Sequence, residues 1–470
     1  MGIWTGSINY AKSSQVFTEQ AAPLADPSST LWHPPLKLRA FLVVWRLAWI
    51  VLMPAILGYL FWRGQREPLY RQRIAERFGF HAKRTAPHVW VHAVSIGELR
   101  SAVPLIRAFV QRGDPVVTTH FTPAGLSEAE RVFAPEIAAG QLTATYVPFD
   151  YGRALRRFFR AFQPRVGLVM EVEFWPGMIM AARNAGVPLY LCNGQYPVKS
   201  FERDRTRALS PADLVPGFAG VMVKSDLQAN RFRALGQANV AITGEMRFEQ
   251  PIPDTQLSAA TAARTTLAGD RRVITLASVV EAEDGLFIKT IQDVLSQTSD
   301  PPLFIYVPRA PQRFDAVARM IAEAGLGSAR RSVVFNDDLT LTSEPKIDVL
   351  VGDSLGEMYF YLGLCDVAVA GGGFNPKGSH NIIEPLALRK PVIVGPQIWT
   401  IEYPALEAIK AGVARQVGPD ALATVLSKPD LTDKARISHF LDDHAGSVEK
   451  TLATLRDWGM KSGNNPDGTR

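Results

Sequence analysis

Short apolar runs alternate with longer stretches of helical periodicity from residue 88 onward. In the first half, the apolar runs that predict buried strands are Val89–Ala93, Val116–Thr119, Ala144–Val147, Val166–Met170, Pro188–Leu191 and Gly220–Val223. The segments that predict helices between them are Leu99–Gln111, Arg153–Phe162, Gly177–Ala185 and Asp226–Ala234. This alternation predicts a parallel sheet that is covered by helices on both faces.

The pattern pauses over a polar, proline-containing stretch at Gly244–Thr261 and then starts again. The second set of predicted strands is Val273–Ala277, Leu303–Val307, Val349–Val351, Val367–Ala370 and Pro391–Val394, and helices are expected to begin near Glu283, Arg313, Gly356, Ile382 and Tyr403. The chain is therefore expected to form two doubly wound α/β domains. Ligands of such sheets bind beyond the carboxyl ends of the strands, so the cleft between the domains is the expected site.

A long apolar segment with one charged residue, Phe41–Trp62, precedes both domains. At about 1.5 Å per residue, a helix of this length would span roughly the 30 Å hydrocarbon core of a bilayer. Arg46 near its start could reach the headgroups. A signal peptide would have a shorter apolar core and a small-residue cleavage site. A buried core helix is the other alternative, and a membrane anchor over residues 40–63 is the favoured interpretation.

The flanks of the apolar segment predict its orientation. Four arginines follow it and two basic residues precede it: Arg63, Arg66, Arg71 and Arg73, against Lys37 and Arg39. The excess on the carboxyl side places the large domains in the cytoplasm. The expected organisation is a disordered tail over 1–39, the anchor over 40–63, a first domain over 64–245 and a second over 246–470 with the C-terminal helices.

Composition narrows the choice of partners. The 470 residues carry a formal net charge of +6, which favours an anionic partner such as a membrane surface, a phosphorylated lipid or a nucleotide. No long basic run or aromatic–basic repeat indicates nucleic acid, so no nucleic-acid partner is expected. The two cysteines, Cys192 and Cys365, are far apart in apolar runs, which argues against a disulfide framework or a zinc site.

Two acidic motifs follow predicted strands of the first domain. In His92–Glu98 a strand ends, a small-residue loop follows, and Glu98 starts a helix. Such a glutamate is either a helix cap or a general base that faces the cleft. In Met170–Pro176, Glu171 and Glu173 follow a fully apolar strand beside Trp175. A metal-binding pair is disfavoured, because no second acidic cluster completes an oxygen-rich shell.

The second domain carries the residues expected to hold phosphate and ribose. Arg309 and Arg313 open a predicted helix after a strand, where guanidinium groups suit phosphate oxygens. The glycine-rich stretch Gly371–Pro385 ends another strand, and its backbone N–H groups could approach a ligand closely. Glu384, one turn into the next helix, is placed to accept both hydroxyls of a ribose. No G-x-G-x-x-G motif opens either half, which disfavours dinucleotide binding.

These stretches together resemble the Kdo transferases, which transfer 3-deoxy-D-manno-octulosonic acid from its CMP ester to lipid A precursors in Gram-negative bacteria. The resemblance runs from about Phe41 to at least Ala411. It rests on the apolar anchor and on Tyr70–Arg73, Glu76–Gly79, His92–Glu98, Met170–Pro176, Phe232–Gly236, Pro308–Phe314, Leu355–Glu357, Gly378–Pro385 and Gly395–Pro396, which follow one another in the family's order.

The resemblance implies a GT-B fold and an inverting transfer that uses no cofactor and no metal at the sugar nucleotide. It implies that Glu98 is the general base and that Glu171 and Arg247 stabilise the transition state. It assigns CMP binding to Pro308, Arg309, Leu355, Gly356, Glu357, Asn381, Ile382, Ile383 and Glu384. The implied partners are CMP-Kdo, a lipid A precursor and the bacterial inner membrane, with the catalytic domains on its cytoplasmic face.

The sequence also departs from the family pattern at several pocket positions. Ser278–Val280 replaces Ser-Thr-His, Ala310 replaces a histidine of Pro-Arg-His-Pro, and Gln397 replaces the histidine of Gly-Pro-His. Thr400–Ile401 replaces Asn-Phe, Asn193–Tyr196 replaces Asn-Ala-Arg-Leu, and Arg247 replaces lysine.

Three functions therefore remain open. The first is a Kdo transferase that acts on lipid IVA in lipopolysaccharide biosynthesis. The second is a related transferase for another ulosonic acid or another glycolipid. The third is a non-catalytic nucleotide- or glycolipid-binding paralogue, which the retained glutamates disfavour. The number of sugars added and the oligomeric state are not indicated by the sequence.

Overall fold

A computed structural model describes residues 32–205, 207, 209–428 and 433–460. The chain forms two compact units, of which one comprises residues up to Gln250 together with those from Gly446 onward, and the other comprises Pro251–Ala445. Each unit is built on a seven-stranded parallel sheet. The predicted pair of doubly wound parallel sheets is confirmed, and the fold is of the GT-B class.

The sheet of the first unit has the strand order β3-β2-β1-β4-β5-β6-β7. Its strands are β1 (Val89–His92), β2 (Val116–His120), β3 (Leu142–Tyr146), β4 (Val166–Met170), β5 (Leu189–Gly194), β6 (Gly220–Val223) and β7 (Val240–Ile242). The helices are α3 (Ile74–Arg77), α4 (Ile96–Gln111), α5 (Pro123–Val132), α6 (Ala134–Ala138), α7 (Gly152–Phe162), α8 (Pro176–Asn184), α9 (Val198–Arg205) and α10 (Asp226–Ala234). Because the central strands are buried on both faces, they read as continuous apolar runs.

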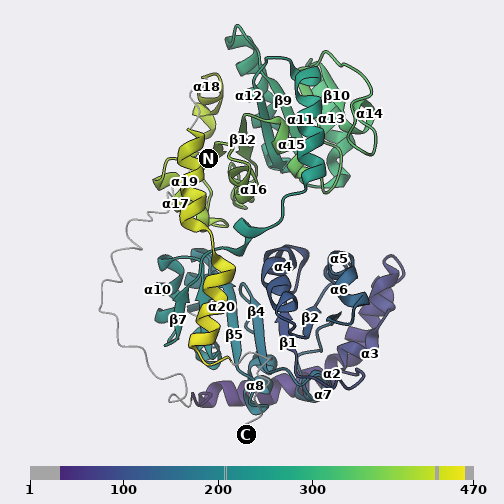
Figure 1. The fold of residues 1–470 in the computed structure, drawn as a ribbon, viewed down its shortest axis with the longest axis vertical. Coiled ribbons are helices and arrows are strands. Elements are labelled where there is room, and N and C mark those ends of the chain that lie inside the picture. The colour runs from purple at the N-terminus through teal and green to yellow at the C-terminus, as the bar shows by residue number, and fades with distance from the viewer. Residues whose placement is uncertain (1–31, 206, 208, 429–432, 461–470) are drawn as a thin grey trace. The chain divides into compact units, whose positions relative to one another are not determined.

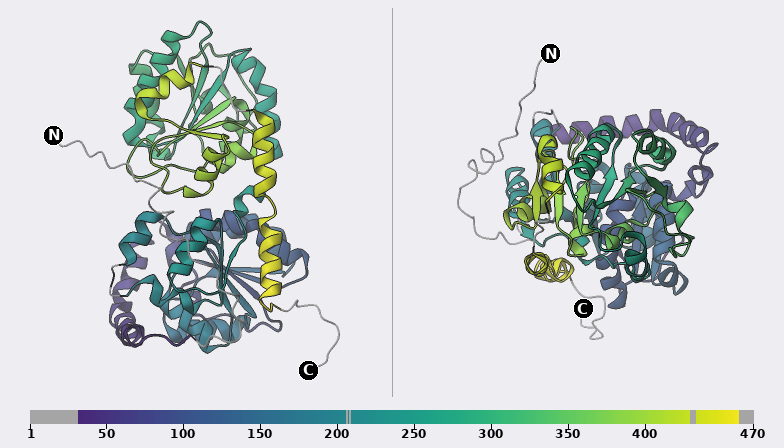
Figure 2. Two further views of the ribbon diagram at one scale, coloured as in Figure 1. Left: turned by 90° about the vertical axis from the view of Figure 1, so that its left-hand side faces the viewer. Right: turned by 90° about the horizontal axis from the view of Figure 1, so that it is seen from above.

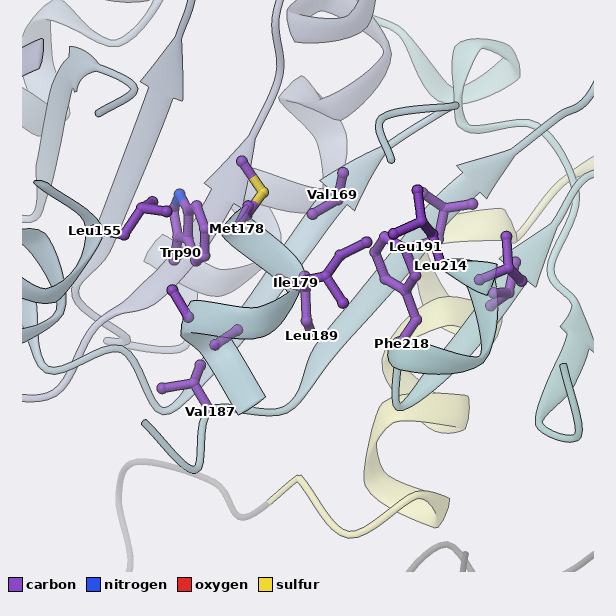
Figure 3. Close-up of a cluster of buried hydrophobic side chains, with 14 of the residues drawn as sticks. Trp90, Leu155, Val169, Met178, Ile179, Val187, Leu189, Leu191, Leu214 and Phe218 are labelled. Atoms are coloured by element: carbon purple, nitrogen blue, oxygen red, sulfur yellow. The ribbon is translucent and has the colours of Figure 1, made fainter. Parts of the chain in front are cut away.

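The core of this unit is divided by the sheet into two apolar layers. Figure 3 shows part of one layer, where Trp90, Met178 and Leu189 gather with residues of neighbouring elements. The indole of Trp90 is fully buried and donates to the Thr119 hydroxyl at 2.8 Å. Burial of the large apolar side chains supplies most of the driving force for the fold, and this hydrogen bond satisfies the polar atom of the tryptophan.

The apolar N-terminal segment forms one long helix, α2 (Leu36–Arg63), that lies beside α7 and α8 of the first unit (Figure 1). The expected disordered tail over 1–39 is wrong at its end, because Trp32 packs against the core of the first unit and the helix starts at Leu36, whereas residues 1–31 lie outside the described residues. The helix is long and apolar enough to cross a membrane by length and composition. Pro54 lies within it.

The C-terminal helix α20 (Ser447–Asp457) belongs to the first unit, although chain order groups it with the second (Figures 1 and 2). The ring of Trp458 stacks on Tyr190 with centroids 5.5 Å apart, and Glu249 accepts hydrogen bonds from the Ser447 hydroxyl and the Val448 N–H. The first unit is thus completed by residues from both ends of the chain.

The second unit repeats the architecture with the strand order β10-β11-β9-β8-β12-β13-β14. Its strands are β8 (Val273–Val279), β9 (Leu303–Pro308), β10 (Ser328–Arg330), β11 (Val349–Val351), β12 (Val367–Ala370), β13 (Val392–Val394) and β14 (Ala414–Gln416). The helices are α11 (Asp254–Ala268), α12 (Asp284–Gln297), α13 (Phe314–Glu323), α14 (Arg331–Val334), α15 (Met358–Leu364), α16 (Ile383–Ala387), α17 (Glu402–Lys410), α18 (Leu422–Leu426) and α19 (Lys434–His444).

The sequence prediction did not include β7, β10 and β14. Each has three residues. The strands β10 and β14 are the two edge strands of the second sheet, and β7 is an edge strand of the first sheet. An edge strand is covered less completely than a central one, so it needs no continuous apolar run and leaves little signal in the sequence.

Candidate active site

Glu98 lies in the first turn of α4, directly after the loop that leaves β1. Its Oε2 accepts hydrogen bonds from the backbone N–H groups of Val94 and, at 3.2 Å, Ser95. The Ser95 hydroxyl in turn accepts from the Glu98 N–H at 3.4 Å. The arrangement is a capping box, so the capping role considered from the sequence is present in the structure.

The surroundings of Glu98 also fit it for proton transfer. Burial, followed by the negative charges of Glu171 and Glu173, raises the pKa of the Glu98 carboxyl to about 7. The two backbone hydrogen bonds oppose this shift, but they do not cancel it. A carboxylate with a pKa near neutrality holds a transferred proton far better than an ordinary glutamate, while a substantial fraction of it is ionised near neutral pH.

Glu171 follows the carboxyl end of β4 and has a left-handed backbone with φ of 57°. Non-glycine residues seldom adopt this conformation, and they do so mostly where the surrounding structure holds them for a function. The Glu171 Oε1 accepts a hydrogen bond from Arg247 Nη2 at 2.7 Å. Arg247 Nε donates to the Ser101 hydroxyl of α4 at 2.6 Å. The structure therefore brings together two of the three predicted catalytic residues as an ion pair.

A second layer of charged side chains lies behind this pair. Lys224 Nζ lies 2.7 Å from Glu245 Oε2 and 3.8 Å from Glu171 Oε1, and both Lys224 and Glu245 are buried. Gln195 donates to Glu171 at 3.4 Å and accepts from Lys224 at 3.0 Å. Asn193 donates to Glu245 at 2.9 Å. We call these four residues, Asn193, Gln195, Lys224 and Glu245, the supporting network.

The supporting network contributes to the lowered pKa of Glu245, the carboxyl group next to Arg247. Burial alone would raise the pKa of Glu245, but Lys224 and Arg247 outweigh burial and hold the pKa of Glu245 below its ordinary value. These cations favour the ionised form of Glu245, and its Oε1 accepts the backbone N–H of Arg247 at 3.2 Å. An ion pair of this kind, once buried, specifies one arrangement of its neighbours.

Sequence reasoning did not assign a role to Lys224 or Glu245. Both follow short strands, β6 and β7, at the same carboxyl edge of the sheet from which Glu98 and Glu171 emerge. A polar residue immediately after an apolar strand is therefore the signal that could have found Lys224. Glu245 gave no such signal, because β7 was not predicted.

Glu173, the other acid of the second motif, has a separate environment. Its Oε2 accepts a hydrogen bond from the Trp175 indole at 2.5 Å, and burial raises the pKa of its carboxyl. The indole is the partner that a half-buried carboxylate beside Trp175 requires. The negative charge of Glu173 is one of the causes that raise the pKa of Glu98. Within the described residues, no group of three His, Cys, Asp or Glu side chains could hold a metal ion.

In the second unit, Arg309 is an exposed residue immediately after β9. Its backbone N–H donates to the carbonyl of Val279 at 2.9 Å, which ties the loop to the end of β8. Burial and then the charge of Arg309 lower the pKa of His380 to about 4, so the arginine lies near the glycine-rich loop. Arg313 is engaged differently, since it forms an ion pair with Asp284 and donates to Val279.

The glycine-rich loop after β12 is held by Glu283, which is fully buried. The carboxylate accepts the N–H groups of Gly372 at 2.7 Å and Phe374 at 2.9 Å. A Cβ on Gly371 would come within 2.6 Å of the carbonyl oxygen of Ser278 at the end of β8, so only glycine fits there. Ser278 itself has a positive φ of 59°. Backbone contacts thus define this edge of the second sheet.

The remaining predicted CMP-binding residues lie on two other loops. Leu355 is 71% exposed, Gly356 has a positive φ of 81°, and Glu357 forms an ion pair with Arg331 at 2.7 Å. Asn381 Oδ1 accepts the N–H of Ile383 at 2.9 Å and so begins α16. Glu384 lies in the first turn of this helix, and Ile382 and Ile383 are buried. Because all strands of the sheet are parallel, these loops and Arg309 follow carboxyl strand ends on one edge.

Comparison with known proteins identifies close counterparts. A family model described as 3-deoxy-D-manno-octulosonic-acid transferase (kdotransferase) matches residues 72–250. The 3-deoxy-D-manno-octulosonic acid transferase of Bordetella pertussis is 38% identical over 398 residues, which cover 81% of this chain and 91% of that protein. That of Haemophilus influenzae is 29% identical over 365 residues, 76% of this chain and 82% of that protein.

A solved glycosyltransferase from Rickettsia africae shares the fold. The match has a TM-score of 0.51 at 10% identity and covers 80% of this chain and 99% of that one.

Proposed function

The chain belongs to the 3-deoxy-D-manno-octulosonic acid (Kdo) transferase family, and we propose that it transfers Kdo from CMP-Kdo to the lipid A precursor lipid IVA in lipopolysaccharide biosynthesis. Family membership makes it a glycosyltransferase. The observation that carries the reaction is the Glu98 carboxyl, whose pKa is raised to about 7 beside the Arg247–Glu171 pair.

In the proposed reaction Glu98 is the general base. Its carboxylate takes the proton of an acceptor hydroxyl while the hydroxyl oxygen attacks the anomeric carbon of Kdo. The bond from that carbon to the CMP phosphate oxygen breaks, and CMP leaves with the bonding electrons. Attack opposite to the leaving group inverts the configuration. The raised pKa allows Glu98 to hold the proton as it is released from the hydroxyl.

Arg247 and Glu171 stabilise the charges that develop during transfer. The guanidinium is fixed by the Glu171 carboxylate at 2.7 Å and the Ser101 hydroxyl at 2.6 Å, so its position does not have to be established during the reaction. Preorganised charges of this kind contribute strongly to catalysis because little reorganisation is needed in the transition state.

CMP would be held by the loops at the carboxyl edge of the second sheet. Arg309 pairs with the phosphate, Leu355–Glu357 and Pro308 contact the nucleotide, and Glu384 at the start of α16, in the Asn381–Glu384 turn, accepts the ribose hydroxyls. A phosphate monoester is a good leaving group, and an arginine can stabilise its charge. The proposed mechanism therefore calls for neither a metal nor another cofactor.

A CMP-release assay tests this proposal. The full chain is expected to release CMP from CMP-Kdo in the presence of tetra-acylated lipid IVA, without added divalent cation, and mass spectrometry of the lipid should show added Kdo. Glu98→Ala should abolish release. Wild-type turnover in this variant would reject Glu98 as the base.

A second candidate is transfer of another ulosonic acid by the same chemistry. Gln195, which lies in a stretch that departs from the family pattern, contacts both Glu171 at 3.4 Å and Lys224 at 3.0 Å. A changed residue so close to the proposed catalytic pair could alter the choice of sugar. A panel of CMP-linked ulosonic acids would decide, since activity with one of them and none with CMP-Kdo would favour this candidate.

The site of action proposed here is the cytoplasmic face of the bacterial inner membrane. The apolar helix α2 supports a location at a membrane, and the cytoplasmic face of the inner membrane is what the family resemblance implies. A charged nucleotide sugar does not cross a bilayer unaided, so the donor loops must lie on the side of the membrane where the donor is made.

A further inference from the structure

The contacts of α2 with the first unit extend from its first turn to its last. Near the start, Lys37 forms an ion pair with Asp213 at 2.8 Å. In the middle, the Trp45 indole donates to the backbone carbonyl and the carboxylate of Asp150 at 3.1 and 3.0 Å. Beyond the end, Arg71 donates to the carbonyl of Phe61 at 2.8 Å. Protein contacts of α2 therefore occur near its start, at its middle and just beyond its end.

The opposite face of α2 is an exposed apolar stripe. Its large side chains are Val43, Val44, Leu47, Ile50, Val51 and Leu52, followed by Tyr59, Phe61 and Trp62. Val44, Leu47 and Val51 are 63%, 58% and 74% exposed. An exposed apolar stripe of this kind marks an interaction surface, and its length and hydropathy suit contact with lipid. Aromatic residues at its end suit the boundary between headgroups and acyl chains.

These two faces do not fit a helix that crosses the bilayer. If α2 spanned the hydrocarbon core, Asp150 and the polar backbone of the first unit would be drawn into it with the middle of the helix. Placing charged and unpaired polar groups in hydrocarbon costs several kcal/mol each. A helix that lies along the interface keeps the protein side in water and gives the apolar stripe to lipid.

Two cavities lined by arginines flank α2 where it meets α7. One, of about 320 Å³, is lined by Arg46, Arg156 and Arg160 with apolar side chains such as Trp45 and Phe159. The other, of about 550 Å³, is lined by Arg46, Arg153, Arg156 and Arg157 with Trp49, Ile50 and Met53. Each cavity thus combines guanidinium groups with apolar side chains, and Ile50 links the second cavity to the exposed stripe.

The charges of these cavities are not matched by protein anions. The described part of the chain shows no ion pair for Arg46, Arg153, Arg156 or Arg160. Asp150 also lines the first cavity, but it is buried and accepts the N–H groups of Gly177 and Met178 at the start of α8. The first turn of α7 contains no acid and carries Arg153, an unfavourable position for a cation at the positive end of a helix.

We propose that α2 lies in the plane of the membrane surface without crossing it, and that the cavities beside it bind the phosphate of an anionic bilayer phospholipid through Arg46, Arg153, Arg156 and Arg160. The apolar stripe of α2 then lies among the acyl chains of the same lipids. The proposal goes beyond sugar transfer and does not depend on it, because binding is measured without either substrate.

Vesicle flotation of the full chain tests the phosphate sites. The wild type should bind vesicles of equimolar phosphatidylcholine and phosphatidylglycerol more tightly than vesicles of phosphatidylcholine. The variant Arg46→Gln/Arg153→Gln/Arg156→Gln/Arg160→Gln should lose roughly 10²–10³-fold in affinity for the anionic vesicles, at about 1 kcal/mol for each arginine. Its affinity for phosphatidylcholine should change little.

A matched variant removes four exposed charges elsewhere, Arg112→Gln/Arg319→Gln/Arg415→Gln/Lys434→Gln, and should lose much less affinity. Equal losses in the two variants would reduce the effect to net charge and overturn the proposal. It is also overturned if the first variant keeps its vesicle affinity and raises only the KM for the lipid acceptor, since the cavities would then hold the acceptor.

The orientation of α2 is tested by labelling in membrane vesicles. Cys192 and Cys365 are fully buried, so the wild type serves as the unlabelled blank. A membrane-impermeant maleimide should label Ser13→Cys and the exposed Ser296→Cys from the same side. Labelling of the two cysteines from opposite sides would show that α2 crosses the bilayer and would overturn the proposal.

Discussion

The carboxyl edges of the two sheets carry different kinds of site. The edge of the first sheet is crowded with charged side chains that hold one another, from Glu98 through the Arg247–Glu171 pair to Lys224 and Glu245. The edge of the second sheet is shaped by backbone: a glycine-rich loop is fixed by one buried carboxylate, and Arg309 is an exposed charge beside it. The first arrangement suits proton transfer and charge stabilisation, and the second suits a phosphate and a sugar ring held by a rigid surface.

Both edges share one device. Each contains a non-glycine residue with a positive φ directly at a strand end, Glu171 at 57° in the first sheet and Ser278 at 59° in the second. Such backbones persist only where their neighbours hold them. In the first unit the left-handed backbone positions the side chain of Glu171. In the second unit it lies where the backbone of Ser278 closely approaches Gly371.

The variant Glu98→Gln is expected to have the largest effect that distinguishes the role of the first edge from that of the second. The amide oxygen can still accept the N–H groups that cap α4, but it cannot take a proton. We expect kcat to fall by about 10²–10⁴-fold, the usual contribution of a general base. The KM for CMP-Kdo should not change, because the donor loops are in the second unit. Steady-state kinetics with CMP-Kdo and lipid IVA provides the measurement.

Ser95→Ala is the control for this variant. It removes the hydroxyl of the capping box and should cost about 1 kcal/mol of unfolding free energy in a denaturant titration. The turnover number should stay near that of the wild type. A loss of activity comparable to that of Glu98→Gln would mean that Glu98 matters only as a cap.

Arg247→Gln should give the next largest effect. The neutral side chain leaves the Glu171 carboxylate without the partner it has at 2.7 Å and removes a positive charge from the first edge. We expect kcat to fall by about 10²–10³-fold, as for other preorganised groups. Arg247→Lys should recover most of the activity, because the charge returns. If Arg247→Gln instead raised only the KM for CMP-Kdo, Arg247 would act in donor binding, as the residues at the edge of the second sheet are proposed to do.

Glu283→Gln tests the edge of the second sheet. The buried carboxylate accepts two N–H groups of the glycine-rich loop, and the amide can replace it at only one of its two atoms. We expect the KM for CMP-Kdo to rise by about tenfold, equivalent to about 1.4 kcal/mol for one charge-assisted hydrogen bond, with kcat little changed. Glu281→Gln, two residues away and exposed, is the matched control. A fall in kcat at constant KM would contradict the contrast between the two edges.

The pH profile is the finest test of the first edge. Because the pKa of Glu98 is raised to about 7, kcat/KM should fall as the pH drops below 7, where the base becomes protonated, and reach a plateau above it. Glu173 raises this pKa, so Glu173→Gln should move the midpoint to lower pH and increase the rate at pH 6. Glu202→Gln, an exposed acid on α9, should leave the midpoint in place.

The sequence predicted the central part of both sheets because buried parallel strands leave continuous apolar runs. Val166–Met170, Gly220–Val223 and Val367–Ala370 were placed to the residue. The three-residue edge strands left no such runs, and the return of α20 to the first unit could not be inferred from chain order. Its anchor, the stacking of Trp458 on Tyr190, joins residues that no local pattern relates.

Some residues of the candidate site could likewise be predicted from the sequence, and others could not. Glu98, Glu171 and Arg309 could be chosen because charged residues next to apolar strands are conspicuous, and the roles of Glu98 and Glu171 were inferred from family resemblance. The supporting network could not be assembled, because its contacts join side chains from different strand ends. Glu283 was marked only as the start of a helix, since its hydrogen bonds to Gly372 and Phe374 arise from the pairing of β8 with β12.

The place of α20 also sets an order of events during synthesis. The first unit needs Ser447–Asp457 for its last layer of packing, and these residues leave the ribosome only after the whole of Pro251–Ala445 has been made. Domains usually fold as they emerge, the N-terminal one first. The surface around Tyr190 therefore stays uncovered until residues 251–445 have been translated, and closure of the first unit follows synthesis of the second.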